Sequence, residues 1–335
     1  MLSRLGLWDF WRRIPLRLLI QFIDHEHPRR FPETIQIEPT SKCNLRCPAC
    51  SHAREKDAGR HLVKEDFKKI LDRLPWTPKS ITLSGIGEPL ISPHFFSLVD
   101  ILAERKIRCV LYTNGTLLTP RTRKAIISRR NIEDIFISCD GAEKMTFENL
   151  RVGASFEHWK KAVFQLFTEA KEQSRQTMRI SAHIVLCKQN LDQVTEIIRL
   201  TADLGFYGVQ LFEPVPHDNV VASICPSREE MNRIRQEDLF KLARALRLRT
   251  ACHFRRYRLP PKSVMRCIQP WEYIFIRANG DIFPCYAIFG YEKGALMGNI
   301  FQQDFMEIWR GDCFRKFRRT SAAGTNMLCR ICPYY

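Results

Sequence analysis

The sequence SKCNLRCPAC, residues 41–50, holds three cysteines, Cys43, Cys47 and Cys50, separated by three and then by two residues. It follows a strand-like run, residues 34–38, and is predicted to form a loop at a strand end. Three thiolates on so short a loop can converge on one soft metal centre, and iron–sulfur clusters are held by cysteine thiolates. With three ligands, a [4Fe–4S] cluster keeps one iron open for a small molecule. Zinc is the rival, and it would need a fourth ligand such as His52.

Length and composition bound the class of protein. With 335 residues and 45% hydrophobic content, the chain can bury one large core and a small appended module. A net charge of +17 indicates either a solvated basic surface or an anionic partner, whether phosphorylated substrate, acidic peptide, nucleic acid or membrane surface. The odd count of 13 cysteines in a long chain argues against a disulfide scaffold and favours a reducing cytoplasm.

The N-terminal 30 residues are apolar and basic. The apolar run within residues 5–23 is broken by Gln21 and closed by Asp24, which leaves it too short to span a bilayer. We expect residues 1–30 to form an amphipathic helix, either packed on the enzyme body or in peripheral contact with a membrane surface. No segment is predicted to be transmembrane.

From residue 34 onward, strand patterns alternate with helix patterns. This alternation predicts parallel βαβ units, in which functional sites gather where the strands end. The predicted strands are 34–38, 80–84, 108–112, 134–138, 178–186 and 208–212. The predicted helices are 64–74, 93–105, 120–128, a long one through 159–166, 191–204 and a stretch at 228–248.

A second cysteine set lies near the C-terminus. Cys267 precedes a hairpin signalled by Asn279-Gly280, Cys285 closes that hairpin, and Cys329 and Cys332 follow. Four cysteines in one compact module fit either zinc or an iron–sulfur cluster, and spacing alone leaves the two open.

The spacing Cys43-x-x-x-Cys47-x-x-Cys50 resembles that of the radical S-adenosylmethionine (radical SAM) enzymes. This resemblance implies a [4Fe–4S] cluster whose open iron binds SAM, and reductive cleavage of SAM to a 5′-deoxyadenosyl radical that abstracts hydrogen from substrate. The turn Gly85-Ile86-Gly87-Glu88-Pro89 is similar to the family's SAM-binding turn, with Ile86 in place of a glycine. By itself this sequence predicts only a turn.

The same resemblance implies further contacts to SAM at the ends of later strands. Ser138 and Asp140 resemble ribose-contacting residues, and Asn114 is expected to face the same cavity. Arg151 resembles an arginine that pairs with the SAM carboxylate, a task that suits a bidentate guanidinium. A plain surface arginine is the alternative.

The C-terminal cysteines, with the hairpin between them, resemble the SPASM/twitch extension of radical SAM enzymes. The resemblance implies one auxiliary [4Fe–4S] cluster, because the chain stops at Cys329-x-x-Cys332, and its expected ligands are Cys267, Cys285, Cys329 and Cys332. The expected fold is α/β, a partial (β/α)6 TIM-like barrel with a small C-terminal α+β twitch (SPASM-like) module. The expected segments are residues 1–30, an extension; 31–225, the barrel; 226–264, a helical connector; and 265–335, the cluster module.

The reaction expected from the resemblance is hydrogen abstraction from a small molecule, followed by dehydrogenation or epimerisation. Cys187 and Cys225 are candidate hydrogen donors for epimerisation, against the alternative that both are ordinary thiols. About 40 residues precede the cluster loop, too few for the usual leader-binding domain of peptide-maturing relatives, which favours a small and, given the charge, anionic substrate. A flavodoxin- or ferredoxin-type reductant is the expected electron donor. The alternatives are a radical SAM peptide maturase and, less favoured, a zinc- or cluster-bearing nucleic-acid-binding protein.

Overall fold

The computed structural model describes residues 28, 30–54, 59–175, 177–253, 267–286, 295–330 and 332. The helix predicted within residues 1–30 lies almost wholly outside the described residues. None of the helices in the described part of the chain is long and apolar enough to cross a bilayer.

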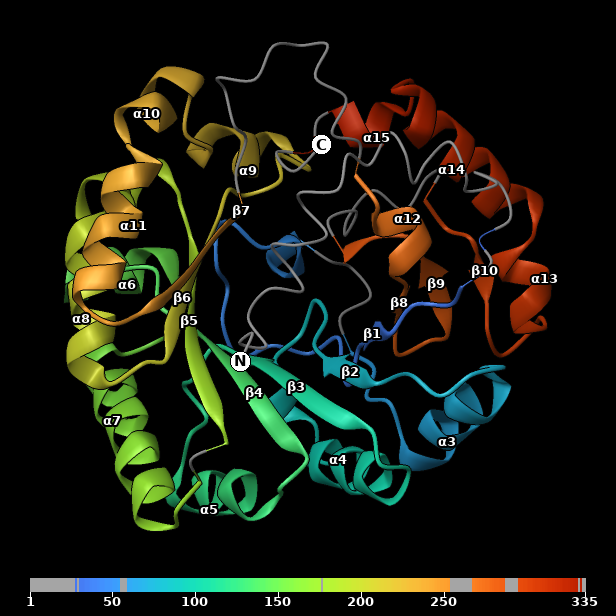
Figure 1. Cartoon of the computed structure of the whole chain (residues 1–335), viewed down its shortest axis with the longest axis horizontal. Coiled ribbons are helices and arrows are strands. Elements are labelled where there is room, and N and C mark those ends of the chain that lie inside the picture. The colour runs from blue at the N-terminus through green and yellow to red at the C-terminus, as the bar shows by residue number, and fades with distance from the viewer. Residues whose placement is uncertain are drawn as a thin grey trace, which may run out of the picture.

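One curved sheet organises the described chain, in the order β10-β9-β8-β1-β2-β3-β4-β5-β6-β7 (Figure 1). Each neighbouring pair from β8 through β1 to β7 runs parallel, as the alternating pattern predicts. The strands of the barrel are β1 (Thr34–Ile37), β2 (Ser80–Leu83), β3 (Arg108–Thr113), β4 (Ile132–Ser138), β5 (Arg179–Val185), β6 (Gly208–Phe212) and β7 (Arg249–His253).

Helices cover the outer face of this sheet (Figure 1). Their apolar stripes face the strands; in α3, for example, Phe67, Ile70 and Leu71 are buried. The helices are α3 (Lys64–Arg73), α4 (Phe95–Glu104), α5 (Pro120–Ser128), α6 (Lys144–Leu150), α7 (Phe156–Glu172), α8 (Val194–Leu204), α9 (Asn219–Ile224), α10 (Arg228–Arg233) and α11 (Gln236–Ala245). Short 3-10 helices are η1 (Ser51–Arg54), η2 (Pro89–Ile91) and η3 (Lys188–Gln193).

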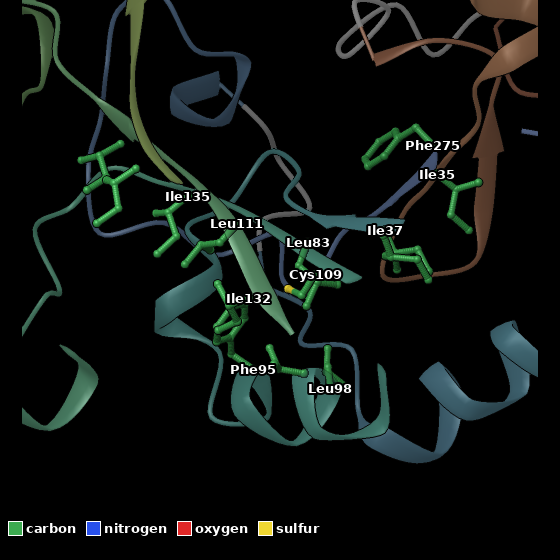
Figure 2. Close-up of a cluster of buried hydrophobic side chains, with 14 of the residues drawn as sticks. Ile35, Ile37, Leu83, Phe95, Leu98, Cys109, Leu111, Ile132, Ile135 and Phe275 are labelled. Atoms are coloured by element: carbon green, nitrogen blue, oxygen red, sulfur yellow. The ribbon is translucent and has the colours of Figure 1, made fainter. Parts of the chain in front are cut away.

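The core lies between the sheet and these helices. Alternate strand residues such as Leu111 and Ile135 are buried in the same cluster as Phe95 and Leu98 of α4 (Figure 2). The intervening residues of the same strands point to the inner face of the barrel and are only half-buried, a period-2 pattern that is plain along β5. The inner face is therefore available to a site.

The C-terminal module continues the sheet. β8 (Phe275–Ile276) pairs parallel with β1, and β9 (Asp281–Phe283) and β10 (Gly298–Asn299) add antiparallel strands. Gly280 has a φ of 89° in the turn between β8 and β9, where the Asn279-Gly280 signal predicts a hairpin. The module's helices are α12 (Gln269–Glu272), α13 (Phe305–Trp309), α14 (Asp312–Ala323) and α15 (Met327–Arg330). The predicted partial barrel with a small α+β module is confirmed.

Two details differ from the predicted elements. The barrel sheet has a seventh parallel strand, β7, in the stretch predicted as a helical connector, because the sequence RTACH carries neither apolar alternation nor an apolar run. The long helix predicted through residues 159–166 is preceded by a separate helix, α6, and Gly153, with a φ of 99°, lies between α6 and α7.

Candidate metal and cofactor centres

The loop between β1 and η1 carries Cys43, Cys47 and Cys50. Cys47 is 8% exposed and the other two are half-buried, so the loop that follows the C-terminal end of β1 partly shields all three thiols from solvent. The Ser41 hydroxyl accepts hydrogen bonds from the backbone N–H groups of Gly59 and Arg60, at 3.1 and 3.0 Å, and so ties the two ends of the loop together.

Asn114, predicted to face the SAM cavity, is bonded to the cysteine loop. Its Nδ2 donates to Asn44 Oδ1 at 3.0 Å, and Asn44 Nδ2 donates to Thr116 Oγ1 at 2.9 Å. Asn44, next to the first cysteine, is a residue that the sequence analysis missed. These bonds hold the cysteine loop against the end of β3.

The glycine turn after β2 packs on the same loop. A Cβ added at Gly87 would lie 2.3 Å from the carbonyl oxygens of Thr40 and Lys42, and the Glu88 N–H donates to the Lys42 carbonyl at 2.8 Å. Glycine is therefore required where the turn and the loop backbones meet.

The Glu88 carboxylate connects the ends of β2 and β3. It accepts hydrogen bonds from Thr113 Oγ1 at 2.6 Å, the Asn114 N–H at 2.7 Å and the Leu90 N–H at 3.2 Å. Only 3% of Glu88 is exposed, and burial raises the pKa of its carboxyl group, whereas these three donors act to lower it. Glu88 is thus a fixed, bonded carboxylate beside the cysteine loop.

Asp140 and Arg151, both predicted SAM contacts, form a buried ion pair with 2.5 Å between Oδ2 and Nη2. Asp140 Oδ1 also accepts from the Val185 N–H at 2.8 Å, and Arg151 Nη1 lies 3.8 Å from Cys47 Sγ. The pair therefore places a guanidinium against the cysteine loop. Ser138 ends β4 in register with His183 of β5.

Of the two candidate hydrogen-donor cysteines, Cys187 lies between β5 and η3, and Cys225 caps the C-terminal end of α9. Cys187 is 1% exposed and packs with Leu150 and Ile224, with Ala49 of the cysteine loop at the edge of this cluster. Burial raises the pKa of Cys187 to about 12 and that of Cys225 to about 11, so both are protonated thiols at neutral pH. A hydrogen-atom donor needs an intact S–H bond.

The C-terminal cysteines lie around α12 and α15. Burial raises the pKa of Cys267 to about 12, and the charges of Cys332 and Cys329 add to this rise. The fourth predicted ligand, Cys285, follows β9 and is half-buried.

A buried arginine connects the helices of this module. Arg318 of α14 is fully buried, donates to the carbonyls of Pro270 and Trp309 at 3.0 and 2.8 Å, and stacks over the Trp309 ring at 4.1 Å. Since Pro270 lies in α12, just after Cys267, Arg318 fixes α12 relative to α14.

We expect Arg318→Met to destabilise the module by about 2 to 4 kcal/mol, because two buried carbonyls lose their donor. The iron content of the reconstituted protein should decrease, because the C-terminal centre loses iron. SAM cleavage in the absence of substrate should persist. Iron analysis and the unfolding midpoint measure this, with Arg319→Met, exposed on the same helix, as the control. Equal iron contents and equal unfolding midpoints in the two variants would contradict the conclusion that Arg318 fixes α12 relative to α14.

Both cysteine sets fit iron–sulfur clusters by donor chemistry, because soft thiolates are the ligands that such clusters prefer. Among the described residues, no three His, Cys, Asp or Glu side chains stand as a ready-made metal site. Cys43 Sγ and Cys50 Sγ instead accept bonds from the N–H groups of Leu45 and His52, each at 3.4 Å. Nε of Arg151 is buried without a hydrogen-bond partner in the described chain, which leaves a polar group beside the cysteine loop for a bound molecule.

Comparison with known families covers both cysteine sets. A model of the radical SAM superfamily matches residues 37–201, and a model of the SPASM iron–sulfur cluster-binding domain matches residues 267–333. The first range contains the cysteine loop, and the second contains all four C-terminal cysteines.

Individual proteins are similar along most of the chain. The AdoMet-dependent heme synthase of Methanosarcina barkeri is 27% identical over 326 residues, covering 90% of this chain and 89% of that protein. The PqqA peptide cyclase of Bradyrhizobium diazoefficiens is 25% identical over 307 residues, covering 86% and 76%. The structure of Streptococcus suis SuiB bound to precursor peptide SuiA matches with a TM-score of 0.72 and 17% identity, covering 99% of this chain and 77% of that one.

Proposed function

Because the chain belongs to the radical SAM superfamily and carries a C-terminal SPASM iron–sulfur domain, we propose that it is an enzyme that modifies a peptide by hydrogen abstraction. Its cofactors are SAM, the [4Fe–4S] cluster of the radical SAM domain and the iron–sulfur centre of the SPASM domain. The observation that carries the peptide proposal is the match of 99% of this chain to the fold that holds a precursor peptide in SuiB. The similarity to a peptide cyclase supports it.

The residues around the cysteine loop have separate roles in this proposal. Cys43, Cys47 and Cys50 would hold the radical SAM cluster, and SAM bound there supplies a 5′-deoxyadenosyl radical that removes a hydrogen atom from an unactivated C–H bond. Glu88 keeps the glycine turn and the end of β3 fixed relative to the loop. The Arg151 guanidinium, oriented by Asp140, brings positive charge to Cys47.

The C-terminal cysteines would hold one auxiliary cluster in this proposal. Cys267, Cys285, Cys329 and Cys332 supply four thiolates, enough to ligate one cluster fully. Full ligation leaves no iron open to bind substrate, so this centre is suited to accepting or passing an electron. An oxidised peptide product follows if the substrate radical loses its electron there.

A second candidate outcome is epimerisation, and the position of Cys187 favours it. Its thiol is buried beside Ala49 of the cysteine loop and is protonated at neutral pH. Transfer of that hydrogen atom to a substrate radical leaves a thiyl radical, which one electron from the reductant and one proton from solvent would restore. Incorporation of solvent deuterium into product, lost in Cys187→Ala, separates this outcome from oxidation.

The cofactor content is tested by anaerobic reconstitution with iron and sulfide. We expect about eight irons per chain and 5′-deoxyadenosine formation under dithionite. The variant with Cys43, Cys47 and Cys50 all changed to Ala should keep about four irons and lose 5′-deoxyadenosine formation. Zinc in place of iron, or no SAM cleavage by the wild type, would overturn the proposal.

The peptide substrate is tested by deuterium transfer. The reconstituted enzyme is incubated with the peptide fraction or the small-molecule fraction of a fully deuterated lysate of the source organism, and 5′-deoxyadenosine is examined by mass spectrometry. We expect deuterium from the peptide fraction and its loss after that fraction is hydrolysed to amino acids. Deuterium from the small-molecule fraction alone would contradict the peptide proposal and favour a small substrate, a class that includes the tetrapyrroles suggested by the heme synthase similarity.

A further inference from the structure

Four aromatic side chains line the inner face of the barrel on neighbouring strands. Tyr112 of β3, Phe136 of β4, His183 of β5 and Phe212 of β6 are all half-buried, and together they form what we call the aromatic wall. They alternate with fully buried residues that pack toward the helices, namely Leu111, Ile135, Ile184 and Leu211. The wall therefore lies on the face of the sheet away from the helical layer.

The rings of the aromatic wall are in contact with one another. Tyr112 stacks on Phe136 with ring centroids 4.4 Å apart and planes at 20°. His183 stacks on Phe212 at 4.5 Å and 28°, and meets Tyr112 edge-on at 5.5 Å and 81°. Two stacked pairs joined by an edge contact make a continuous π-surface across four strands.

This surface ends where the candidate cofactor loops begin. His183 is the register partner of Ser138, and Tyr112 directly precedes Thr113, whose hydroxyl bonds to Glu88. Phe212 is the last residue of β6. A group resting on the wall would therefore lie beside the place where SAM is expected to bind.

One polar group is built into the wall. The Tyr112 hydroxyl donates to Gln210 Oε1 at 3.3 Å, which orients the Gln210 amide next to the rings. A mostly apolar surface with few fixed polar groups is typical of ligand sites. Because the four rings are only half-buried, part of their apolar area can be covered by a bound group.

We propose that the aromatic wall is a substrate subsite that takes a flat aromatic group and holds it beside the radical SAM centre. The proposal rests on the proposed function, in which this group is an aromatic side chain of the peptide substrate. The same chemistry is offered by a porphyrin ring, and the experiment distinguishes the two sources. An aliphatic side chain would cover the rings but would gain no stacking contact.

The test is equilibrium dialysis of the reconstituted full chain with SAM and three probes. These are N-acetyl-Gly-Tyr-Gly-amide, its Leu analogue and a tetracarboxylate porphyrin. We expect the Tyr peptide to be retained about 2- to 10-fold more strongly than the Leu peptide. Phe212→Leu, and Phe136→Leu as a second variant, should remove this preference. Phe240→Leu, exposed on α11, is the matched control and should keep it.

Each outcome decides the question. Equal retention of the two peptides, a preference unchanged in both wall variants, or no retention of any probe would overturn the subsite. Retention of the porphyrin alone, lost in the wall variants, would support an aromatic subsite and overturn its assignment to a peptide. If the two peptides are retained equally but deuterium still passes from the peptide fraction to 5′-deoxyadenosine, the subsite fails and the peptide function stands.

Discussion

Replacing Glu38 with alanine is expected to lower the unfolding midpoint of the protein by about 5 to 10 °C, because it breaks a buried ion pair and two buried hydrogen bonds. Glu38 is 1% exposed and lies just past the end of β1. Its Oε2 lies 3.7 Å from Arg277 Nε and accepts from the Ala278 N–H at 3.2 Å, while its Oε1 accepts from the Ile86 N–H at 3.0 Å.

One carboxylate therefore bonds both the glycine turn after β2 and the chain just past β8, where the C-terminal hairpin turns. The Gly85 backbone also packs on it, since a Cβ added there would lie 2.5 Å from Glu38 Cγ. Loss of the carboxylate should loosen the turn as well as the module, so SAM affinity should fall together with stability. Circular dichroism melting and equilibrium binding of SAM measure the two effects.

An exposed ion pair provides the matched control. Glu33 pairs with Lys79 at 2.7 Å, and their side chains are 70% and 65% exposed. Glu33→Ala should cost about 0 to 1 kcal/mol, because exposed pairs contribute little. Glu38→Gln should fall between the two variants, since it keeps an acceptor and removes the charge. If the Glu38→Ala and Glu33→Ala proteins had the same unfolding midpoint and the same affinity for SAM, Glu38 would not be the residue that joins the glycine turn to the C-terminal module.

The parts of the site that could be predicted are local in sequence. Cys43, Cys47 and Cys50 share one loop, and apolar periodicity was enough to predict the parallel strands around them. The cluster and the barrel came from the resemblance of this spacing to that of radical SAM enzymes. The Asn279-Gly280 turn is equally local, because a two-residue signal sets the hairpin geometry.

The residues that were missed act over long distances in the chain. Glu38 bonds a group 48 residues away, and Asn44 bonds Asn114, 70 residues away. No sequence period encodes such pairs, since they arise only when strand ends are brought together by the sheet. The one available signal for Glu38 was an acidic residue directly after the apolar strand 34–37, where a buried charge requires a partner.

The backbone contact of Gly87 is another long-range feature that no sequence period encodes. From the sequence, Gly87 was expected in a turn similar to the SAM-binding turn of radical SAM enzymes, and in the structure this glycine meets the backbone of the cysteine loop. The packing contact is compatible with the SAM-binding role proposed for this turn, because a turn that packs on the cysteine loop also lies beside the site proposed for the cluster.

Gly87→Ala is the second change with a large expected effect. The added Cβ would lie 2.3 Å from two carbonyl oxygens, those of Thr40 and Lys42, and 2.9 Å from the Lys42 nitrogen. Backbone atoms cannot rotate away as a flexible side chain can, so either the turn or the cysteine loop must move. Displacement of about 1 Å at a reacting centre costs on the order of 100-fold in rate. We therefore expect SAM cleavage to fall by about 100-fold or more.

Gly59→Ala is the matched control, because an added Cβ there meets no atom within 4 Å and leaves the loop undisturbed. The expected pattern in Gly87→Ala is selective, with iron lost from the radical SAM centre and retained by the C-terminal cysteines. Iron content after reconstitution, and 5′-deoxyadenosine formed under dithionite, measure the two centres separately. If Gly87→Ala cleaved SAM within a few-fold of Gly59→Ala, the contact between the glycine turn and the cysteine loop would not govern the geometry of the cluster site.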